Sequence, residues 1–450
     1  MGRDLLSRMR READRIFKAS VEAVDPYRAV RNFVRLEGNR LLLGLEAEDA
    51  IELDMETFDR IFVIGGGKAT APMARAVEDL LADQIREGLV NVKYGFAEKL
   101  RHIRIVEAGH PVPDRKGIEG TRGILQILEK AGDRDLVFSL ISGGGSALLP
   151  QPSEGIGLPE KQEITRMLLE CGASIDEINA VRKHISSSKG GQMARAAFPA
   201  TVVNLMLSDV VGDKMDVIAS GPFVPDSSTF GEVRRILEKY RLEKIPPSIA
   251  SRLKKGAAGE IPDTPKQGDP VFNRIHNFIV GSNILALRAA ARQAQREGYG
   301  VLILSSMVEG ETREVARVHS AVAKEVLSTG EPLPAPACVI SGGETTVTIR
   351  GNGLGGRNQE FCLAAALDLE DLAERVVILS GGTDGNDGPT DAAGAVVDPS
   401  TVAKAREMGL SPENFLENND SYRFFEQTGD LLKTGPTKTN VMDVRLVLVR

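Results

Sequence analysis

Short apolar runs alternate with longer segments of helical period along the first part of the chain. Five runs have the length of strands: residues 60–67, 89–95, 103–109, 136–145 and 201–209. Their apolar residues are continuous, which is typical of strands that are covered on both faces. Between Leu158 and Cys171 apolar residues recur at helical spacing, and Pro159 suits the first turn of a helix. The pattern predicts a Rossmann-like α/β domain with a largely parallel sheet.

The pattern changes between Glu238 and Asp269, where the chain is rich in Pro, Gly and charge. A second series of strands and helices follows and begins with the apolar run 276–283. Within it, residues 345–351 alternate with a period of two after a Ser-Gly-Gly turn, which indicates a returning strand and a mixed sheet. We therefore predict two α/β domains, residues 1–266 and 267–450, with an interdomain cleft that the carboxyl ends of the strands face.

Charge and composition exclude several classes of function. Acidic residues number 63 and basic residues 56, so no basic field exists to attract nucleic acid or an acidic membrane surface. Residues 1–17 predict an amphipathic first helix, and no apolar run is long enough to span a bilayer. The three cysteines are far apart and fit reduced thiols. We expect a cytoplasmic protein whose partners are small molecules and which binds neither nucleic acid nor a membrane. The residues leave open whether it forms a homo-oligomer.

Three apolar runs end on Ser-Gly-Gly, at residues 142, 341 and 380. Glycine at a strand-to-helix turn lets backbone amides approach an anion, although such a turn can also serve close packing alone. The candidates for binding nucleotide phosphates are Ser142, Gly143, Gly144, Gly145 and Ser146, together with Gly66 and Gly67 of the sequence GGGKAT. Neither loop has the spacing of a P-loop, and Thr70 stands where a dinucleotide fingerprint requires its third glycine.

Two cations stand beside glycine-rich turns. Lys68 lies at the start of a predicted helix, where a positive charge opposes the dipole unless an anion compensates it, although a solvated surface lysine is the plainer interpretation. Arg357 follows four glycines within six positions, and a guanidinium binds carboxylate or phosphate at two points. Lys68, Arg357 and the adjacent Asn358 are therefore candidate substrate contacts.

Acidic residues provide candidate bases and metal ligands. Asp209 ends an apolar strand, and Asp384 and Asp387 lie in a glycine-rich loop. The loop lacks the order of an EF-hand, whereas magnesium takes one or two carboxylates together with substrate phosphates. His110 and His184 are weaker candidates for a general base, because no nucleophile elbow frames a serine. Anion-binding loops, two cations and isolated acids are the components of phosphoryl transfer; a dinucleotide-dependent oxidoreductase is the alternative.

The chain also carries a family signature over nearly its whole length. It resembles the type 2 glycerate kinases, the two-domain glycerate 2-kinase family whose C-terminal part is called the MOFRL domain and whose members have often been labelled hydroxypyruvate reductase. The matching blocks include GGGKAT, EAGHPVPD, SGGGSALL, GASIDEINAVRKHISSSKGG, LSDVVGDKMDVIASGPFVPDSSTF, SGGETTVTIRGNGLGGRNQE, GGTDGNDGPTDAAGAVVD and TGPTKTNVMD.

The resemblance implies ATP-dependent phosphorylation of D-glycerate to 2-phosphoglycerate with a divalent cation such as Mg2+. It implies that Lys68 and Arg357 are the catalytic pair, and it includes the position of Asp209. On both lines of argument we expect the two cations to neutralise the substrate carboxylate and the transferring phosphoryl group. Asp209 is expected to orient or deprotonate the acceptor hydroxyl or to hold the metal, with Asp384 and Asp387 as further metal candidates. The alternative activity is an NAD(P)H-dependent hydroxypyruvate reductase.

Overall fold

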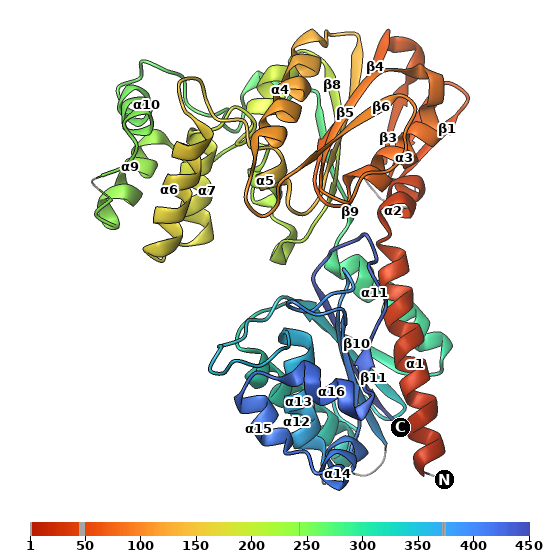
Figure 1. Ribbon diagram of the computed structural model, residues 1–450. Coiled ribbons are helices and arrows are strands. Elements are labelled where there is room, and N and C mark those ends of the chain that lie inside the picture. The colour runs from red at the N-terminus through yellow and green to blue at the C-terminus, as the bar shows by residue number, and fades with distance from the viewer. Residues whose placement is uncertain (1, 45–49, 243, 371, 373–374) are drawn as a thin grey trace. The chain divides into compact units, whose positions relative to one another are not determined.

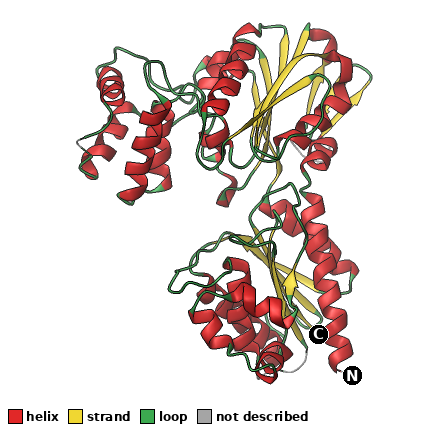
Figure 2. Cartoon of the chain, in the orientation of Figure 1, coloured by secondary structure: helices red, strands yellow, loops and turns green. Residues whose placement is uncertain are grey.

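The computed structural model describes residues 2–44, 50–242, 244–370, 372 and 375–450 (Figure 1). The chain divides into two compact units, which are Pro26–Val280 and the combination of Met1–Asp25 with Gly281–Arg450. Each unit has its own six-stranded sheet with helices packed on it, so the predicted α/β class is confirmed (Figure 2). We call Pro26–Val280 the parallel-sheet unit and the other one the mixed-sheet unit.

The parallel-sheet unit is built on a sheet with the strand order β6-β5-β4-β7-β8-β9. Its strands are β4 (Arg60–Gly66), β5 (Ile85–Lys93), β6 (Ile103–Ala108), β7 (Asp135–Ile141), β8 (Thr201–Leu207) and β9 (Ile275–Gly281). Strand β7 pairs in parallel with β4 and β8, so the carboxyl ends of these three strands lie at the same end of the sheet. Every residue of β7 and β8 is buried, as their continuous apolarity predicts.

Helices cover this sheet, and the first of them after β4 begins at Thr70, close to the candidate residue Lys68. Helix α3 (Thr70–Leu81) packs on β4, β5 and β7, and α4 (Arg115–Lys130) packs with α8 (Gln192–Ala197) on Phe62 and Ile64 of β4. The remaining elements are α2 (Pro26–Phe33), the four-residue α5 (Gly145–Leu148), and a small antiparallel sheet of β1 (Val34–Glu37), β2 (Arg40–Leu43) and β3 (Ile51–Asp54).

Four helices of the same unit form a lobe beside the sheet (Figure 1). They are α6 (Leu158–Glu170), α7 (Ile175–His184), α9 (Phe230–Lys239) and α10 (Pro247–Ala257). The lobe has its own apolar core, in which Ile164, Val181, Val233 and Leu253 are buried, one from each helix. The helix predicted between Leu158 and Cys171 is confirmed as α6.

The mixed-sheet unit has the strand order β10-β11-β15-β12-β13-β14. Its strands are β10 (Gly300–Val308), β11 (Ala337–Gly343), β12 (Val376–Gly382), β13 (Gly394–Val397), β14 (Leu431–Leu432) and β15 (Asp443–Val449). Strands β10 and β11 are parallel, whereas β15 runs antiparallel to both β11 and β12. The predicted mixed sheet is therefore confirmed, as is the last strand.

The predicted return strand at residues 345–351 is wrong. This stretch is irregular apart from a single bridge between Thr346 and Glu311. The reason is that β15 pairs along β11 from Ala337 to Gly343 and occupies the position that a returning strand would take. The antiparallel pairing of β11 therefore comes from the last strand of the chain.

The helices of the mixed-sheet unit include the first helix of the chain. They are α1 (Gly2–Ala23), α11 (Asn283–Arg296), α12 (Thr312–Thr329), α13 (Arg357–Leu369), α14 (Ser400–Glu407), α15 (Pro412–Glu417) and α16 (Ser421–Thr428). Helix α1 packs on α11 and on the sheet. Buried ion pairs reinforce this contact, because Arg10 binds Asp398 and Asp430, and Glu12 binds Arg450.

The two units differ from the predicted ranges 1–266 and 267–450 at both ends. Helix α1 belongs to the mixed-sheet unit, for the packing reason just given. Strand β9 belongs to the first sheet, where Val202 N of β8 donates to Arg274 O and the side chains of Asn204 and Asn277 are hydrogen-bonded. Among the described residues, the helices lack the combination of length and apolarity that a bilayer span requires.

Candidate active site

In the parallel-sheet unit, the two glycine-rich loops are bound to each other. Because β4 and β7 are adjacent parallel strands, the loops that follow them leave the same end of the sheet. Lys68 N donates to Gly143 O at 2.8 Å, and Ala69 N donates to the hydroxyl of Ser142 at 3.0 Å. The structure thus brings together Lys68 and the loop Ser142–Ser146, which lie far apart in the sequence.

Close packing explains several of the glycines. A β-carbon at Gly66 would overlap Leu149, one at Gly67 would overlap Ser142, and one at Gly145 would overlap Ala219. Gly144 has a φ of +82°, a left-handed conformation that side chains disfavour. These positions need glycine for the backbone approach that joins the loops, whatever the loops bind.

The loop nevertheless presents donors suited to an anion. Gly145 N donates to Ser142 O, and the amides of Ala147 and Leu148 in α5 donate to Gly144 O. By contrast, the amides of Gly143, Gly144 and Ser146 have no acceptor within the described chain. Successive backbone N–H groups in a turn with a left-handed residue form an anion-binding concavity. The predicted phosphate contact of Ser142–Ser146 stays a prediction, and this geometry favours it.

Asp209 lies directly against this loop. It follows β8, the neighbour of β7, and a β-carbon at Gly143 would overlap its carboxylate. Burial raises the pKa of Asp209 above its ordinary value, and the charge of Lys68 opposes that rise. The Lys68 ammonium itself has no hydrogen bond or ion pair within the described chain. A half-buried carboxylate and a cation without a hydrogen bond therefore flank the same loop.

His110 joins the same cluster, although its sequence context made it only a weaker candidate for a general base. A β-carbon at Gly144 would lie 2.8 Å from the imidazole of His110 and 3.3 Å from the side chain of Lys68. Burial and then the charges of Lys68 and Lys93 lower the pKa of His110 to about 4. The imidazole is consequently neutral at pH 7, as a hydrogen-bonding group beside an anion site would be.

Behind the loop lies a polar network that the sequence analysis did not single out. The hydroxyls of Ser146 and Ser220 are 2.8 Å apart, and Ser220 Oγ donates to Asn179 Oδ1 of α7 at 3.1 Å. Lys189 Nζ donates to Ser146 O at 2.9 Å, and burial lowers the pKa of Lys189 well below its ordinary value. The only signal in the sequence was the position of these residues within the family blocks.

In the mixed-sheet unit, Arg357 begins α13 and is held by two acids. Its Nε and Nη2 donate to the two carboxylate oxygens of Asp443 at 2.7 and 3.0 Å, and its Nη1 lies 2.9 Å from Glu344 Oε1. The Arg357 side chain is 30% exposed, whereas Asp443 is fully buried. Asp443 was not predicted, although it is the last residue of the family block TGPTKTNVMD and stands at the first position of the last strand.

Asn358 and Asp387 hold the start of the same helix. Asp387 accepts hydrogen bonds from the backbone amides of Asn358 and Gln359, and the Asn358 side chain bonds Asp387, Asp443 and Ser380. Burial raises the pKa of Asp387 to about 7, against the effect of the two amides. Protein groups therefore occupy both side chains, as is typical of residues that cap a helix. The sequence predicts instead a substrate contact at Asn358 and a metal contact at Asp387.

The three predicted metal ligands lie in two different units. Asp209 belongs to the parallel-sheet unit, and Asp384 and Asp387 to the mixed-sheet unit. Asp384 is partly exposed and accepts a hydrogen bond from Asn386 N. Over the described residues, three or more His, Cys, Asp or Glu side chains do not gather in a geometry that could hold a metal ion. A metal bound mainly by substrate phosphates needs no such gathering.

Two protein-family models match the chain. One is a domain of unknown function (DUF4147), which matches residues 12–254, and the other is the MOFRL family, which matches residues 337–443. Together they cover the loops of both sheets that carry Lys68, Asp209 and Arg357.

Relatives that are named for glycerate kinase activity, and one that is named for hydroxypyruvate reduction, are similar over nearly the whole chain. A protein of Pyrococcus horikoshii named glycerate 2-kinase is 42% identical over 437 residues, covering 97% of this chain and 96% of its own. A human protein named glycerate kinase is 35% identical, covering 98% of this chain and 93% of its own. A protein of Agrobacterium vitis named putative hydroxypyruvate reductase is 41% identical, covering 97% and 93%. The solved structure of a glycerate kinase from Thermotoga maritima has a TM-score of 0.89 and 42% identity, covering 99% of this chain and 100% of its own.

Proposed function

The chain belongs to the type 2 glycerate kinase family, and from this premise we propose that it transfers the γ-phosphoryl group of ATP to the 2-hydroxyl of D-glycerate. The observation that carries the proposal is the cluster at the carboxyl ends of β4, β7 and β8. There the ammonium of Lys68, which makes no hydrogen bond within the described chain, meets the carboxylate of Asp209 and the open amides of the 142–146 loop. Phosphoryl transfer depends mainly on positioning and charge neutralisation, which these groups supply.

In this proposal the loop amides and Lys68 bind the phosphoryl group. Asp209 accepts a hydrogen bond from the attacking hydroxyl of glycerate and can take its proton, because burial has raised the pKa of its carboxyl. An oxygen–phosphorus bond to the 2-oxygen forms, and the bond between the γ-phosphorus and the bridging oxygen of ADP breaks. Arg357 is assigned to the glycerate carboxylate as a positive charge that Asp443 orients, because Asp443 occupies the Nε–Nη2 edge of the guanidinium and the remaining N–H groups lie on its other edge.

The divalent cation, magnesium in the simplest case, fits the chemistry of the available donors. Magnesium takes few protein carboxylates and keeps water and phosphate oxygens, so one carboxylate suffices. Asp209 lies against the proposed phosphate loop, and Asp384 is a partly exposed acid in the mixed-sheet unit. When bound, the cation would neutralise charge on the phosphates. A cytoplasmic location, which the unpaired Cys171, Cys338 and Cys362 suit, belongs to the same proposal.

A second candidate function is reduction of hydroxypyruvate with NAD(P)H. The name of the Agrobacterium vitis relative favours it. The first glycine-rich turn disfavours it, because a dinucleotide fingerprint needs a third glycine where this chain has the buried Thr70. Thr70 starts α3 and packs under Gly65, so the turn is built differently.

Phosphorus NMR of the product separates these candidates. The protein is incubated with D-glycerate, ATP and Mg2+, and the phosphorus resonance of the product is recorded with proton coupling. We expect a doublet, because the phosphate of 2-phosphoglycerate couples to one proton. A triplet would mean 3-phosphoglycerate and a wrong choice of hydroxyl. The absence of a phosphorylated product, with NADH oxidised by hydroxypyruvate, would replace the proposal by the second candidate.

A further inference from the structure

A cavity of about 660 Å³ lies within the parallel-sheet unit, between the helical lobe and the loops that follow β8. It is bounded by α7, by α9 and by residues 214–217 and 226–228. Its apolar wall is formed by Ala180, Val217 and Ile236. Its volume falls in the range of pockets for small molecules and cofactors, about 300–1,000 Å³.

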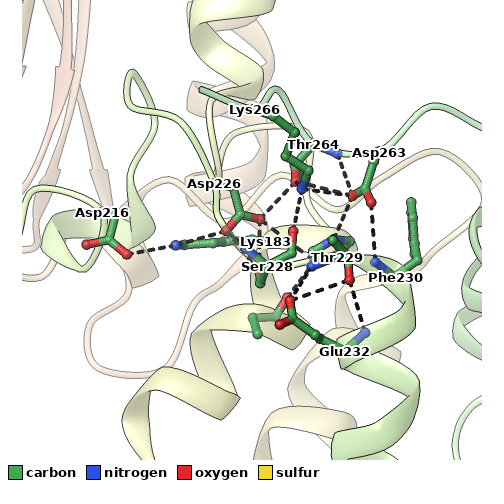
Figure 3. Close-up of polar contacts among 12 residues, drawn as sticks. Lys183, Asp216, Asp226, Ser228, Thr229, Phe230, Glu232, Asp263, Thr264 and Lys266 are labelled. Carbon is green, nitrogen blue, oxygen red and sulfur yellow. Dashed lines mark hydrogen bonds and ion pairs between the residues drawn. The ribbon is translucent and has the colours of Figure 1, made fainter. Parts of the chain in front are cut away.

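Part of the polar lining of the cavity is an ion-pair cluster in which Lys183 contacts the buried Asp226 and the partly exposed Asp216 (Figure 3). Lys183 is 5% exposed, and its ammonium lies 3.3 Å from Asp216 and 3.3 Å from the fully enclosed Asp226. Burial alone would raise the pKa of Asp226, but Lys183 and the hydrogen bonds from Ser228 and Thr264 hold it below its ordinary value. These groups are preorganised, so a ligand would not have to order them.

One side chain connects this cavity to the proposed phosphate loop. Asn179 lines the cavity and is 5% exposed. Its Oδ1 accepts a hydrogen bond from Ser220, whose hydroxyl bonds that of Ser146 in the phosphate loop. Its Nδ2 donor has no acceptor within the described chain. Through Asn179 and Ser220, the cavity lies two hydrogen bonds away from the hydroxyl of Ser146 in the phosphate loop.

The charges that line the cavity and the charges at the phosphate loop suit different parts of a ligand. The charged residues that line the cavity are the acids Asp176, Glu177, Asp216, Asp226 and Glu232 and the bases Lys183, Lys214, Arg235 and Lys239. With one more acid than bases, and with Lys183 already paired twice, the cavity gives no net attraction to a polyphosphate. The phosphate loop does attract a polyphosphate, through the charge of Lys68 and through the loop amides that have no acceptor. The cavity instead suits an uncharged ring system with hydroxyl and amine groups.

We infer that this cavity binds the nucleoside part of ATP, with the phosphates extending past Asn179 to the loop Ser142–Ser146. This inference rests on the proposed kinase function. The base packs against Val217 and Ile236, and its polar edge and the ribose hydroxyls find acceptors and donors in Asp216 and Asn179. The helical lobe thereby has a role in nucleotide binding that its position outside the sheet does not suggest.

The test is to fill the cavity without touching the phosphate loop. Ser227 lines the cavity, is exposed and makes no hydrogen bond within the described chain, so Ser227→Trp should fold normally. Glu238→Trp places the same side chain on an exposed position of α9 outside the cavity and serves as the matched control. Isothermal titration calorimetry then measures the affinity of each protein for adenosine, ATP and inorganic tripolyphosphate.

We expect wild type and Glu238→Trp to bind all three ligands. Ser227→Trp should lose measurable adenosine binding and bind ATP at least tenfold more weakly, while its affinity for tripolyphosphate is unchanged. Unchanged ATP and adenosine affinity in Ser227→Trp, or an equal loss of tripolyphosphate affinity, would overturn the inference. Ile236→Trp gives a second obstruction from the opposite wall, and thermal unfolding checks that each variant is folded.

The outcome also separates this inference from the proposed function. If wild type phosphorylates glycerate and Ser227→Trp keeps the wild-type KM for ATP, the inference fails and the kinase proposal stands. If wild type forms no phosphorylated product but binds adenosine, and Ser227→Trp does not, the nucleoside site stands and the kinase proposal fails.

Discussion

Arg357 and Asp443 form a two-point ion pair in which Nε and Nη2 of the guanidinium donate to the two carboxylate oxygens at 2.7 and 3.0 Å. The same carboxylate accepts from Arg445, which is fully buried and has no other acid within hydrogen-bond reach in the described chain. One buried acid at the start of β15 thus fixes the proposed catalytic arginine and compensates a second cation. Because β15 lies between β11 and β12, the loops after those strands depend on the end of the chain for their order.

Asp443→Asn should destabilise the protein strongly. It leaves the fully buried Arg445 without an acid partner and leaves Arg357 with Glu344 alone, and removing one partner of a buried ion pair costs about 3–5 kcal/mol. Thermal and urea denaturation measure the change in the free energy of unfolding. Asp391→Asn is the matched control, because Asp391 pairs with Lys433 at the exposed surface, and its unfolding should match wild type. Equal stability of the two variants would contradict the central position of Asp443.

Lys68→Ala and Arg357→Ala should each abolish phosphorylation of glycerate with the fold retained. Each removes a cation that is proposed to face developing negative charge, and loss of one such group typically lowers kcat by about 100-fold to 1,000-fold or more. Steady-state kinetics measures the loss, and circular dichroism checks the fold. Lys99→Ala, at an exposed position of the same unit, should keep the wild-type rate. Near-normal turnover in either active-site variant would remove that residue from the mechanism.

His110 should titrate well below an ordinary histidine. Burial and the charge of Lys68 lower its pKa to about 4, so the C2 proton resonance of His110 should shift with a midpoint near pH 4. Assignment is direct, since the chain has 5 histidines and His110→Gln removes one resonance. A midpoint near 6.5 would mean that the imidazole is solvated and separate from the Lys68 cluster.

The same shift fixes the sign of a pH effect on stability. Between about pH 6.5 and 4 the unfolded state binds a proton at His110 that the folded state does not, so the folded state loses stability as the pH falls through this window. His110→Gln removes this contribution. The free energy of unfolding of His110→Gln should therefore fall less than that of wild type between pH 6.5 and 4.

Asp387→Asn distinguishes a helix cap from a metal ligand. The carboxylate accepts from the amides of Asn358 and Gln359, and Asn at this position would keep only one acceptor oxygen. As a cap, the variant should lose about 0.5–2 kcal/mol of stability and keep the wild-type Mg2+ concentration for half-maximal activity. A large rise in that Mg2+ concentration, with stability unchanged, would make Asp387 a metal ligand instead. Asp384→Asn provides the comparison from the same loop.

Local patterns in the sequence were sufficient for much of the fold. Largely apolar runs marked β4, β5, β6, β7 and β8, and for β7 and β8 the reason is burial on both faces, which leaves few polar positions in a strand. The same logic failed at residues 345–351, where alternation is present but the pairing edge of β11 is occupied by β15. It also failed for α1 and β9, since neither the partner of a helix nor the sheet that a strand joins is encoded in its own periodicity.

The sequence by itself determined the α/β class, the glycine-rich turns at the ends of the strands and the motifs that contain Lys68, Asp209 and Arg357, because these depend on neighbouring residues along the chain. Only the tertiary structure decided what those turns face. It placed Asp209 and His110 against Gly143 and Gly144, and it engaged Asn358 and Asp387 in capping α13. Such contacts join residues tens of positions apart, and the pairing of strands, which forms through long-range hydrogen bonds, sets them.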